Sequence, residues 1–218
     1  MFLRTTRSVA WLTLAPLVLA KVATAAPGPA LDDSGLDLTQ RQPWESCMYC
    51  HGAAGDIDDP GVPAIAGQSA AYLRKQLRDY RAGRRVDPER LMTSATDLLD
   101  AEDDAVVAAF FAGRATPGKD LAPQPSDATP GARLYWRGKP GMVACVACHP
   151  PRAWSAPFDY PYLQGLHPAY LEAQLRAYRG GRRTNDAWGV MRGIAAALSD
   201  AELRALATYL GGTLNVME

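Results

Sequence analysis

An internal duplication built around two C-x-x-C-H motifs constrains this sequence more than any other feature. The segment Cys47–His51 recurs 98 positions later as Cys145–His149. The match continues at the same offset between Ala71–Arg85 and Ala169–Arg183. Two copies of one domain explain this better than two unrelated motifs, and a period near 100 residues indicates domain duplication rather than a solenoid.

The duplication divides the chain into two expected domains. We expect residues 26–114 to form one domain, the N-terminal repeat, and residues 131–218 to form another, the C-terminal repeat. Residues 115–130 contain four prolines and little apolar surface, which predicts a semi-extended linker.

Within both repeats the apolar residues recur with helical spacing. Helices are predicted to begin at Ser69 and Pro168, and the last helix of each repeat near Asp100 and Asp200. The predicted apolar faces of these last helices are Val106, Val107 and Phe110, and Leu203, Leu206 and Leu210. A further helix is predicted over 131–144. No segment alternates as a strand does, so the predicted fold class is all-α.

The C-x-x-C-H motif is typical of covalent haem attachment. Two cysteines three residues apart reach the two vinyl groups of one haem, and the adjacent histidine reaches the iron. Zinc sites usually separate their cysteine pairs by far fewer residues, and a thioredoxin-like motif needs a βαβ context. The sequence therefore predicts two covalently bound haem c groups, held by Cys47, Cys50, Cys145 and Cys148, with His51 and His149 on the irons.

Methionines are the candidates for the second axial ligands. Met92 and Met191 occupy equivalent positions in the two repeats, in expected loops ahead of the last helices. Such a methionine can also be a core gap-filler, but the equivalent placement favours ligation, and His/Met ligation suits electron transfer. His167 is expected to be a residue at a helix N-terminus. The alternative is a ligand of the second haem in one redox state.

Prolines and arginines provide a second group of candidates. Pro63 and Pro161 can offer their carbonyl oxygens to the imidazole N–H groups of the axial histidines, or can be loop prolines only. Two arginine pairs follow helix-ending glycines, where they can bind haem propionates or complement a helix dipole: Arg84, Arg85, Arg182 and Arg183.

The first residues predict export. Arg4 and Arg7 precede a largely apolar run over 9–20, and small residues follow at 23–25, which is typical of a secretory signal peptide over 1–25. An uncleaved anchor is the alternative, but the run is shorter than the roughly 20 residues that a spanning helix needs. The expected location is therefore the periplasm.

Charge differs in sign between the repeats. Residues 26–114 hold 9 basic and 15 acidic side chains, and residues 115–218 hold 11 and 8. Such a dipole can steer a charged partner, although it also fits an incidental surface pattern. No basic run indicates nucleic-acid binding.

The segment Ala66–Arg85 closely resembles the di-haem cytochrome c4 family, and the C-terminal repeat resembles it through Gly165, His167, Ala169–Leu171 and Gly181–Arg183. The resemblance implies two tandem class I cytochrome c domains with His/Met haems. It also implies soluble or membrane-associated periplasmic electron transfer, often toward a terminal oxidase. One departure is that the segment before Cys47 lacks a clear counterpart of the helix expected after Gly131.

The leading functional hypothesis is an electron carrier without substrate chemistry. Its expected partners are redox proteins, namely a respiratory complex, a terminal oxidase or a dehydrogenase, and association with a membrane surface is left open. One alternative is a di-haem enzyme, thiosulfate dehydrogenase-like or peroxidase-like, which needs a displaceable axial ligand. Another is the cytochrome subunit of a larger dehydrogenase or oxidase.

Overall fold

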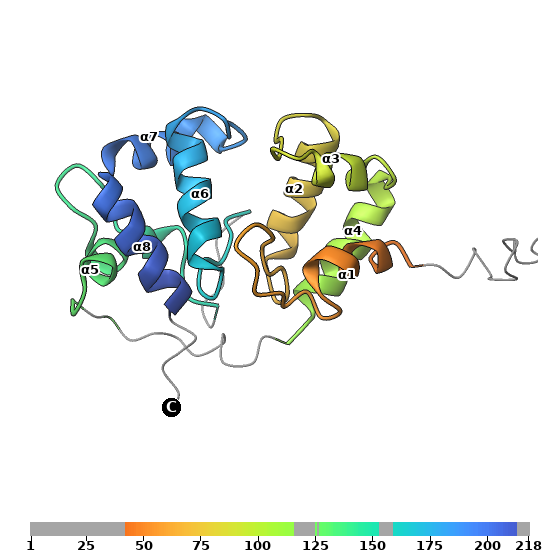
Figure 1. Cartoon of the computed structure of the whole chain (residues 1–218), viewed down its shortest axis with the longest axis horizontal. Helices are drawn as coiled ribbons and strands as arrows, with labels where there is room; N and C mark the ends of the chain where they lie inside the picture. The colour runs from red at the N-terminus through yellow and green to blue at the C-terminus, as the bar shows by residue number, and fades with distance from the viewer. Residues whose placement is uncertain (1–41, 116–124, 126, 153–158, 213–218) are drawn as a thin grey trace, which may run out of the picture. The chain divides into compact units, whose positions relative to one another are not determined.

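The computed structural model describes residues 42–115, 125, 127–152 and 159–212. The N-terminal repeat contains α1 (Glu45–His51), α2 (Ala70–Arg81), α3 (Leu91–Thr96) and α4 (Ala101–Ala112). The C-terminal repeat contains the α-helices α5 (Pro130–Arg137), α6 (Pro168–Arg179), α7 (Val190–Ala197) and α8 (Asp200–Gly212), and the 3-10 helices η2 (Cys145–Ala147) and η3 (Ala187–Gly189). These described segments contain no strand, only one isolated β-bridge, which agrees with the predicted all-α class (Figure 1).

Two predicted segments fall outside the described residues. The signal peptide over 1–25 does so entirely, and the linker over 115–130 does so for residues 116–124 and 126. The domain boundaries at 114 and 131 stay predictions. Among the described residues, no helix combines the length and the apolar character needed to cross a membrane.

Side-chain caps start the longer helices where the sequence predicts. The Ser69 hydroxyl accepts a hydrogen bond from the backbone N–H of Tyr72 (3.3 Å) at the start of α2. The Asp100 carboxylate accepts the N–H groups of Glu102 and Asp103, and the Asp103 carboxylate accepts the N–H of Asp100, which forms a capping box. These bonds satisfy amide groups that the first turn of a helix leaves unpaired.

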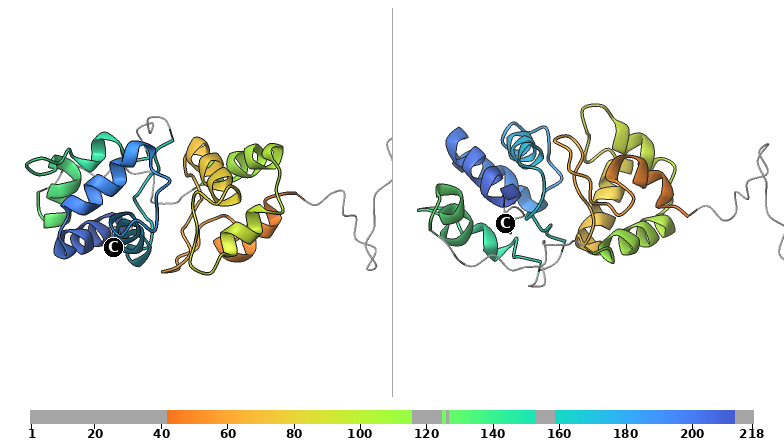
Figure 2. Two further views of the ribbon diagram at one scale, coloured as in Figure 1. Left: turned by 90° about the horizontal axis from the view of Figure 1, so that it is seen from above. Right: turned by 60° about the horizontal axis from the view of Figure 1, so that its bottom comes forward.

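In each repeat the long central helix packs on the last helix. Helix α2 packs on α3 and α4 and buries Leu77 and Phe111, while α6 packs on α7 and α8 (Figure 1 and Figure 2). The predicted apolar face of α8, formed by Leu203, Leu206 and Leu210, is buried completely. The closest helix packing therefore lies within each repeat.

The predicted apolar face of α4 is partly wrong. Val107 is buried, but Val106 is 42% exposed and Phe110 is only half-buried. Phe111 is fully buried in their place, and Asp104 lies on the same buried face. The hydrophobicity pattern predicts that a carboxylate faces solvent. Asp104 can face the core because it forms an ion pair with Arg81 of α2.

The predicted helix over 131–144 is also wrong beyond Arg137. Gly138 takes a positive φ of 69°, and Pro140 follows two residues later. A residue in the positive-φ region ends an α-helix, and a proline shortly after it prevents the helix from resuming. The second cysteine pair is therefore reached through a turn and η2 rather than along one continuous helix.

Helix α5 nevertheless supports the second motif. A Cβ atom at Gly131 would lie 2.1 Å from the carbonyl oxygen of Ala205, so the glycine allows α5 to lie against α8. The buried Tyr135 then donates its hydroxyl to the carbonyl oxygen of His149 (2.8 Å) and accepts from the Gln164 amide (2.6 Å). Close helix packing thus fixes the backbone at the predicted axial histidine.

Candidate haem-binding site

The two cysteine motifs occupy different local structures. Cys47 and Cys50 lie on α1, whereas Cys145 begins η2 and Cys148 follows it. The four cysteines are free thiols. Burial raises the pKa of the Cys47 thiol and raises that of Cys145 to about 11. Burial therefore favours the protonated thiol at Cys47 and Cys145, and none of the four cysteines is tied up in a disulfide.

The two predicted axial histidines make the same hydrogen bond. Nδ1 of His51 lies 2.9 Å from the carbonyl oxygen of Pro63, and Nδ1 of His149 lies 2.9 Å from that of Pro161. A carbonyl oxygen only accepts, so Nδ1 carries the hydrogen and Nε2 keeps its lone pair free. Burial lowers the pKa of both rings, which favours the neutral form that can bind a metal.

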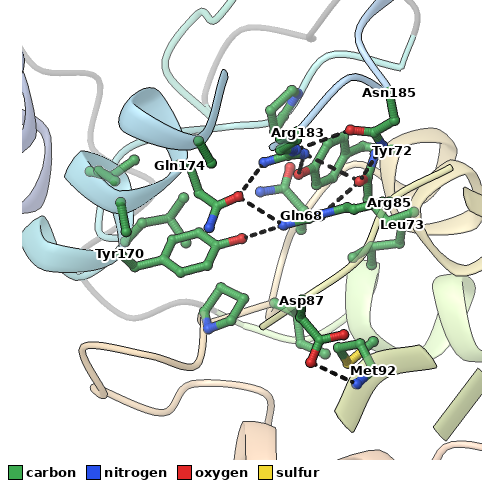
Figure 3. Close-up of a pocket in the computed structure, with 18 of the residues that line it drawn as sticks. Gln68, Tyr72, Leu73, Arg85, Asp87, Met92, Tyr170, Gln174, Arg183 and Asn185 are labelled. Atoms are coloured by element: carbon green, nitrogen blue, oxygen red, sulfur yellow. Dashed lines mark hydrogen bonds between the residues drawn. The ribbon is translucent and has the colours of Figure 1, made fainter. Parts of the chain in front are cut away.

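The predicted axial methionines lie on short helices rather than in loops. Met92 and Met191 are the second residues of α3 and α7. A carboxylate caps each helix: Asp87 accepts the N–H of Met92 (3.3 Å), and Asp186 accepts that of Arg192 (3.0 Å). The backbone at each methionine is therefore held by a side chain outside its own helix, as Figure 3 shows for Asp87 and Met92.

One cavity of about 1090 Å³ borders every predicted attachment and axial residue. The eight are Cys47, Cys50, His51, Met92, Cys145, Cys148, His149 and Met191. Between them the wall includes apolar side chains of the two central helices, among them Leu73 and Leu77 of α2 and Leu171 and Leu175 of α6. An apolar cavity with thiols and neutral imidazoles along its wall has the chemistry that a haem c requires.

Two buried arginines lie in a hydrogen-bonded group that joins the repeats. We call this group the arginine seam; it consists of Tyr72, Gln76, Arg85, Tyr170, Gln174 and Arg183. Figure 3 labels all of them except Gln76. Arg85 donates to Gln76 (2.7 Å) in its own repeat and to Tyr170 (3.0 Å) and Gln174 (3.1 Å) in the other. Arg183 reverses this pattern, since it donates to Gln174 (2.7 Å) and to Gln76 and Tyr72 (3.2 Å each).

The arginine seam carries positive charge that nearby carboxylates do not balance. Arg85 and Arg183 are only 7% and 6% exposed, and neither forms an ion pair with a carboxylate of the described residues. Both border the cavity. Burying an unpaired charge is costly, and guanidinium groups match carboxylates well. The seam therefore fits the anionic propionates of a haem.

The other two predicted arginines differ from these. Arg84 is exposed and donates to the Asp79 carboxylate (2.8 Å). Arg182 is also exposed, but it borders the cavity. The structure therefore brings Arg85, Arg182 and Arg183 to the cavity and leaves Arg84 in an ion pair.

His167 has a structural role in this fold. Its Nδ1 accepts the backbone N–H of Ala169 (3.1 Å), which caps the N-terminus of α6. Ser69 does the same for α2, so equivalent positions in the two repeats use different side chains for one purpose. The geometry agrees with the helix N-terminal reading of this histidine.

Sequence reasoning missed part of the site. Tyr72, Gln76, Tyr170 and Gln174 lie in the repeated segments Ala71–Arg85 and Ala169–Arg183 and were not predicted as site residues, yet they hold the two buried arginines. A usable signal was present, because tyrosine and glutamine recur at equivalent positions of both repeats. A polar glutamine within an otherwise apolar helix face calls for a buried partner.

A second polar cluster also joins the repeats, and three of its four residues come from the N-terminal repeat. Lys75 donates to the carbonyl oxygen of Asn185 (2.6 Å), and the Asn185 amide donates to the Asp79 carboxylate (2.7 Å). Although burial opposes ionisation, hydrogen bonds from Lys75, Asn185 and Arg84 hold the pKa of the Asp79 carboxyl below its usual value. We call Lys75, Asp79, Arg84 and Asn185 the Asp79 cluster.

Comparisons with known proteins agree with this geometry. No family model matches the chain. Cytochrome c4 of Stutzerimonas stutzeri is 38% identical over 177 residues, covering 76% of this chain and 83% of the relative. A protein of Stutzerimonas stutzeri strain A1501 named thiosulfate dehydrogenase electron acceptor is 38% identical over 199 residues, covering 90% of each chain.

A solved structure extends the likeness to the fold. The crystal structure of reduced recombinant cytochrome c4 from Pseudomonas stutzeri matches with a TM-score of 0.65 and 36% identity, covering 77% of this chain and 93% of that one. Relatives at this identity over most of both chains share a fold and its cofactors. The chain therefore belongs to the cytochrome c4 family and is a di-haem electron-transfer cytochrome with covalently bound haem c.

Proposed function

We propose that each repeat attaches one haem through its own C-x-x-C-H motif and binds the iron with its own histidine and methionine. The proposed thioether residues are Cys47 and Cys50 for one haem and Cys145 and Cys148 for the other. The proposed axial pairs are His51 with Met92 and His149 with Met191. A single observation carries this proposal: both histidines donate Nδ1–H to a proline carbonyl and border the same cavity as both methionines.

The chain's own residues prepare each site in the same way. When bound, a haem supplies an iron that gains or loses one electron. The carbonyls of Pro63 and Pro161 orient the imidazoles, which leaves Nε2 available to the metal. The apolar walls exclude water, and Arg85 and Arg183 offset the charge of the propionates.

We further propose that the protein works in the periplasm as a carrier between respiratory redox proteins. The predicted signal peptide over 1–25 and the family relationship support this location. The relative named thiosulfate dehydrogenase electron acceptor supports a dehydrogenase as one electron donor. A terminal oxidase is the proposed acceptor.

The axial-ligand proposal is tested with carbon monoxide and two variants. We expect ferrous protein to bind no carbon monoxide at neutral pH, because both axial positions of each iron are filled. Met92→Ala and Met191→Ala should each remove half of the sulfur-to-iron absorption band of the ferric protein. Intact mass should exceed that of the mature polypeptide by two haems.

The same measurements separate the carrier from a di-haem enzyme. An enzyme of the thiosulfate dehydrogenase or peroxidase kind needs one iron with an open or displaceable ligand. Stoichiometric carbon monoxide binding at one iron, or a methionine variant with an unchanged spectrum, would contradict the carrier proposal at that site. Two one-electron waves in a redox titration would support it.

A further inference from the structure

A strained and exposed tryptophan lies three residues before Met191, one of the four proposed iron ligands. Trp188 has φ 52° and ψ 17°, in the left-handed region, and is 94% exposed. This conformation is rare for a bulky side chain and strains the backbone. Exposing an indole forgoes the burial that usually stabilises it. Folding therefore gains nothing evident from this residue.

The N-terminal repeat shows that the backbone shape does not require tryptophan. Arg90 takes the same left-handed conformation, with φ 54° and ψ 21°, and is likewise exposed. It precedes Met92 by two residues, and Trp188 precedes Met191 by three, since the C-terminal repeat has one extra residue in this loop. The N-terminal repeat therefore enters its methionine helix through one left-handed residue, the N-cap Arg90, whereas the C-terminal repeat uses two, Trp188 and the N-cap Gly189.

The tryptophan loop lies against the haem cavity. Its neighbours Ala187 and Val190 both border the cavity, and so does Met191. Val190 is itself 41% exposed, so an apolar surface continues from the indole toward the cavity. A protein that docked on this loop would lie close to the C-terminal haem, which is the requirement for electron transfer between proteins.

The charge around this loop is positive. Arg182 is exposed at the cavity edge. The guanidinium of Arg192 lies 3.3 Å from where a Cβ of Gly189 would stand, beside the tryptophan. Its partner Asp186 has only 3% of its side chain exposed, whereas Arg192 has 43%. Because Arg192 and Asp186 form an ion pair, the net positive charge of this surface comes from Arg182.

We propose that Trp188 is the docking anchor for a one-electron redox protein that presents an apolar patch bordered by carboxylates. The proposal rests on the carrier function proposed above. One electron passes between the iron of the C-terminal haem and the metal centre of the partner, so that one is oxidised as the other is reduced. Tryptophan and arginine are the side chains that most often dominate binding energy at interfaces.

The test compares two glycine variants with the same backbone effect. Trp188→Gly and Arg90→Gly both place glycine at a left-handed position, so both should keep or raise the melting temperature. The probe is the reduced form of an acidic plant-type [2Fe–2S] ferredoxin, whose low potential drives reduction of a ferric cytochrome. In stopped-flow at low ionic strength, Trp188→Gly should lower the second-order rate constant about tenfold or more, and Arg90→Gly should leave it within about twofold.

Two further measurements make the result specific. Arg182→Gln should lower the rate constant about threefold and flatten its dependence on salt, because it removes one attractive charge. Reduction by ascorbate, which needs no protein docking, should be the same in all variants. Trp188→Phe should retain most of the rate, since it keeps a large apolar side chain.

An unchanged ferredoxin rate in Trp188→Gly would overturn the docking proposal, and so would an equal loss with ascorbate, which would reveal damage to the haem site. Failure of the carrier function looks different. It would appear in the unaltered protein, as fewer than two one-electron waves or as carbon monoxide binding.

Discussion

The two repeats build the same histidine site on different local structures. In the N-terminal repeat the cysteine pair lies on α1, and in the C-terminal repeat it lies on and just after η2, behind α5. Yet each histidine donates to its proline carbonyl over the same 2.9 Å. The feature that both repeats share is therefore the hydrogen bond from the histidine to the carbonyl oxygen of a loop proline twelve residues later. The helix beneath the motif can change without disturbing it.

The repeats also differ in the charge beside the methionine helices. Asp87 accepts the N–H groups of Leu91 and Met92 through one oxygen, and its other oxygen is buried without a hydrogen bond from any described residue. Asp186 instead forms an ion pair with Arg192 (3.0 Å). The same capping carboxylate is thus unbalanced in one repeat and balanced in the other.

A third difference lies where the repeats meet. The arginine seam uses equivalent residues from both sides, whereas the Asp79 cluster does not. At the offset of 98, the counterparts of Lys75 and Asp79 are Ala173 and Ala177. The seam is therefore built from residues that recur in both repeats, whereas Lys75 and Asp79 of the Asp79 cluster have no polar counterparts.

The largest expected effect is a loss of stability caused by a change in the C-terminal repeat. Gly131→Ala forces a Cβ to within 2.1 Å of the Ala205 carbonyl oxygen and should destabilise the protein by about 3 kcal/mol or more, because α5 must move off α8. Urea unfolding followed by circular dichroism measures this loss. Gly113→Ala is the matched control, since its Cβ would meet its nearest atom at 3.4 Å and should change the stability by less than about 1 kcal/mol. Equal effects of the two variants would contradict this account of the packing.

A smaller loss of stability is expected from a change in the Asp79 cluster. Asp79→Asn leaves Lys75 and Arg84 without their carboxylate and should cost about 2 kcal/mol, because the Asp79 carboxylate is itself buried. Asp127→Asn removes an exposed pair with Arg137 and should cost less than about 1 kcal/mol. Chemical denaturation at pH 7 measures the free energies of unfolding of the two variants. A ranking in the opposite order would show that the Asp79 cluster does not stabilise the fold.

The same carboxylate predicts a dependence on pH. The folded-state pKa of Asp79 lies below its ordinary value of 3.8, so the folded protein binds this proton less readily than the unfolded chain. Its stabilising contribution is therefore complete well above pH 4 and is lost as the pH falls through the folded-state pKa. The melting temperatures of the unaltered protein and of Asp79→Asn should converge on acidification from pH 6 to pH 3. A constant difference over this range would contradict the assignment.

The smallest expected effect concerns the two haem potentials. An unbalanced carboxylate favours the ferric state, so we expect the haem of the N-terminal repeat to have the lower potential. Asp87→Asn should raise that potential, and Arg192→Gln should lower the other, each by ~40 mV, which corresponds to ~1 kcal/mol for a one-electron couple. A spectroscopic redox titration measures both waves. Midpoints that move together in either variant would show that these carboxylates do not act on separate haems.

Much of this protein follows from short-range sequence signals. The caps at Ser69 and Asp100 and the start of α6 at Pro168 depend on neighbouring residues, and so they were predicted correctly. Equivalent placement in the two repeats, at an offset of 99, singled out Met92 and Met191 among six methionines, and both border the same cavity as the histidines. These signals are local or are repeated, and either property makes them readable from one sequence.

Tertiary structure alone decided which polar groups turn inward. Asp104 faces the core because a guanidinium from α2 meets it there, and Arg85 and Arg183 are buried because glutamines and tyrosines of both repeats receive their hydrogen bonds. Their burial depends on partners that are far away in the chain, and hydropathy records only the cost of burying them. The two haem motifs and most of the helices around them could be predicted from the sequence. The contacts between the repeats, and therefore the surroundings of each haem, were decided by packing.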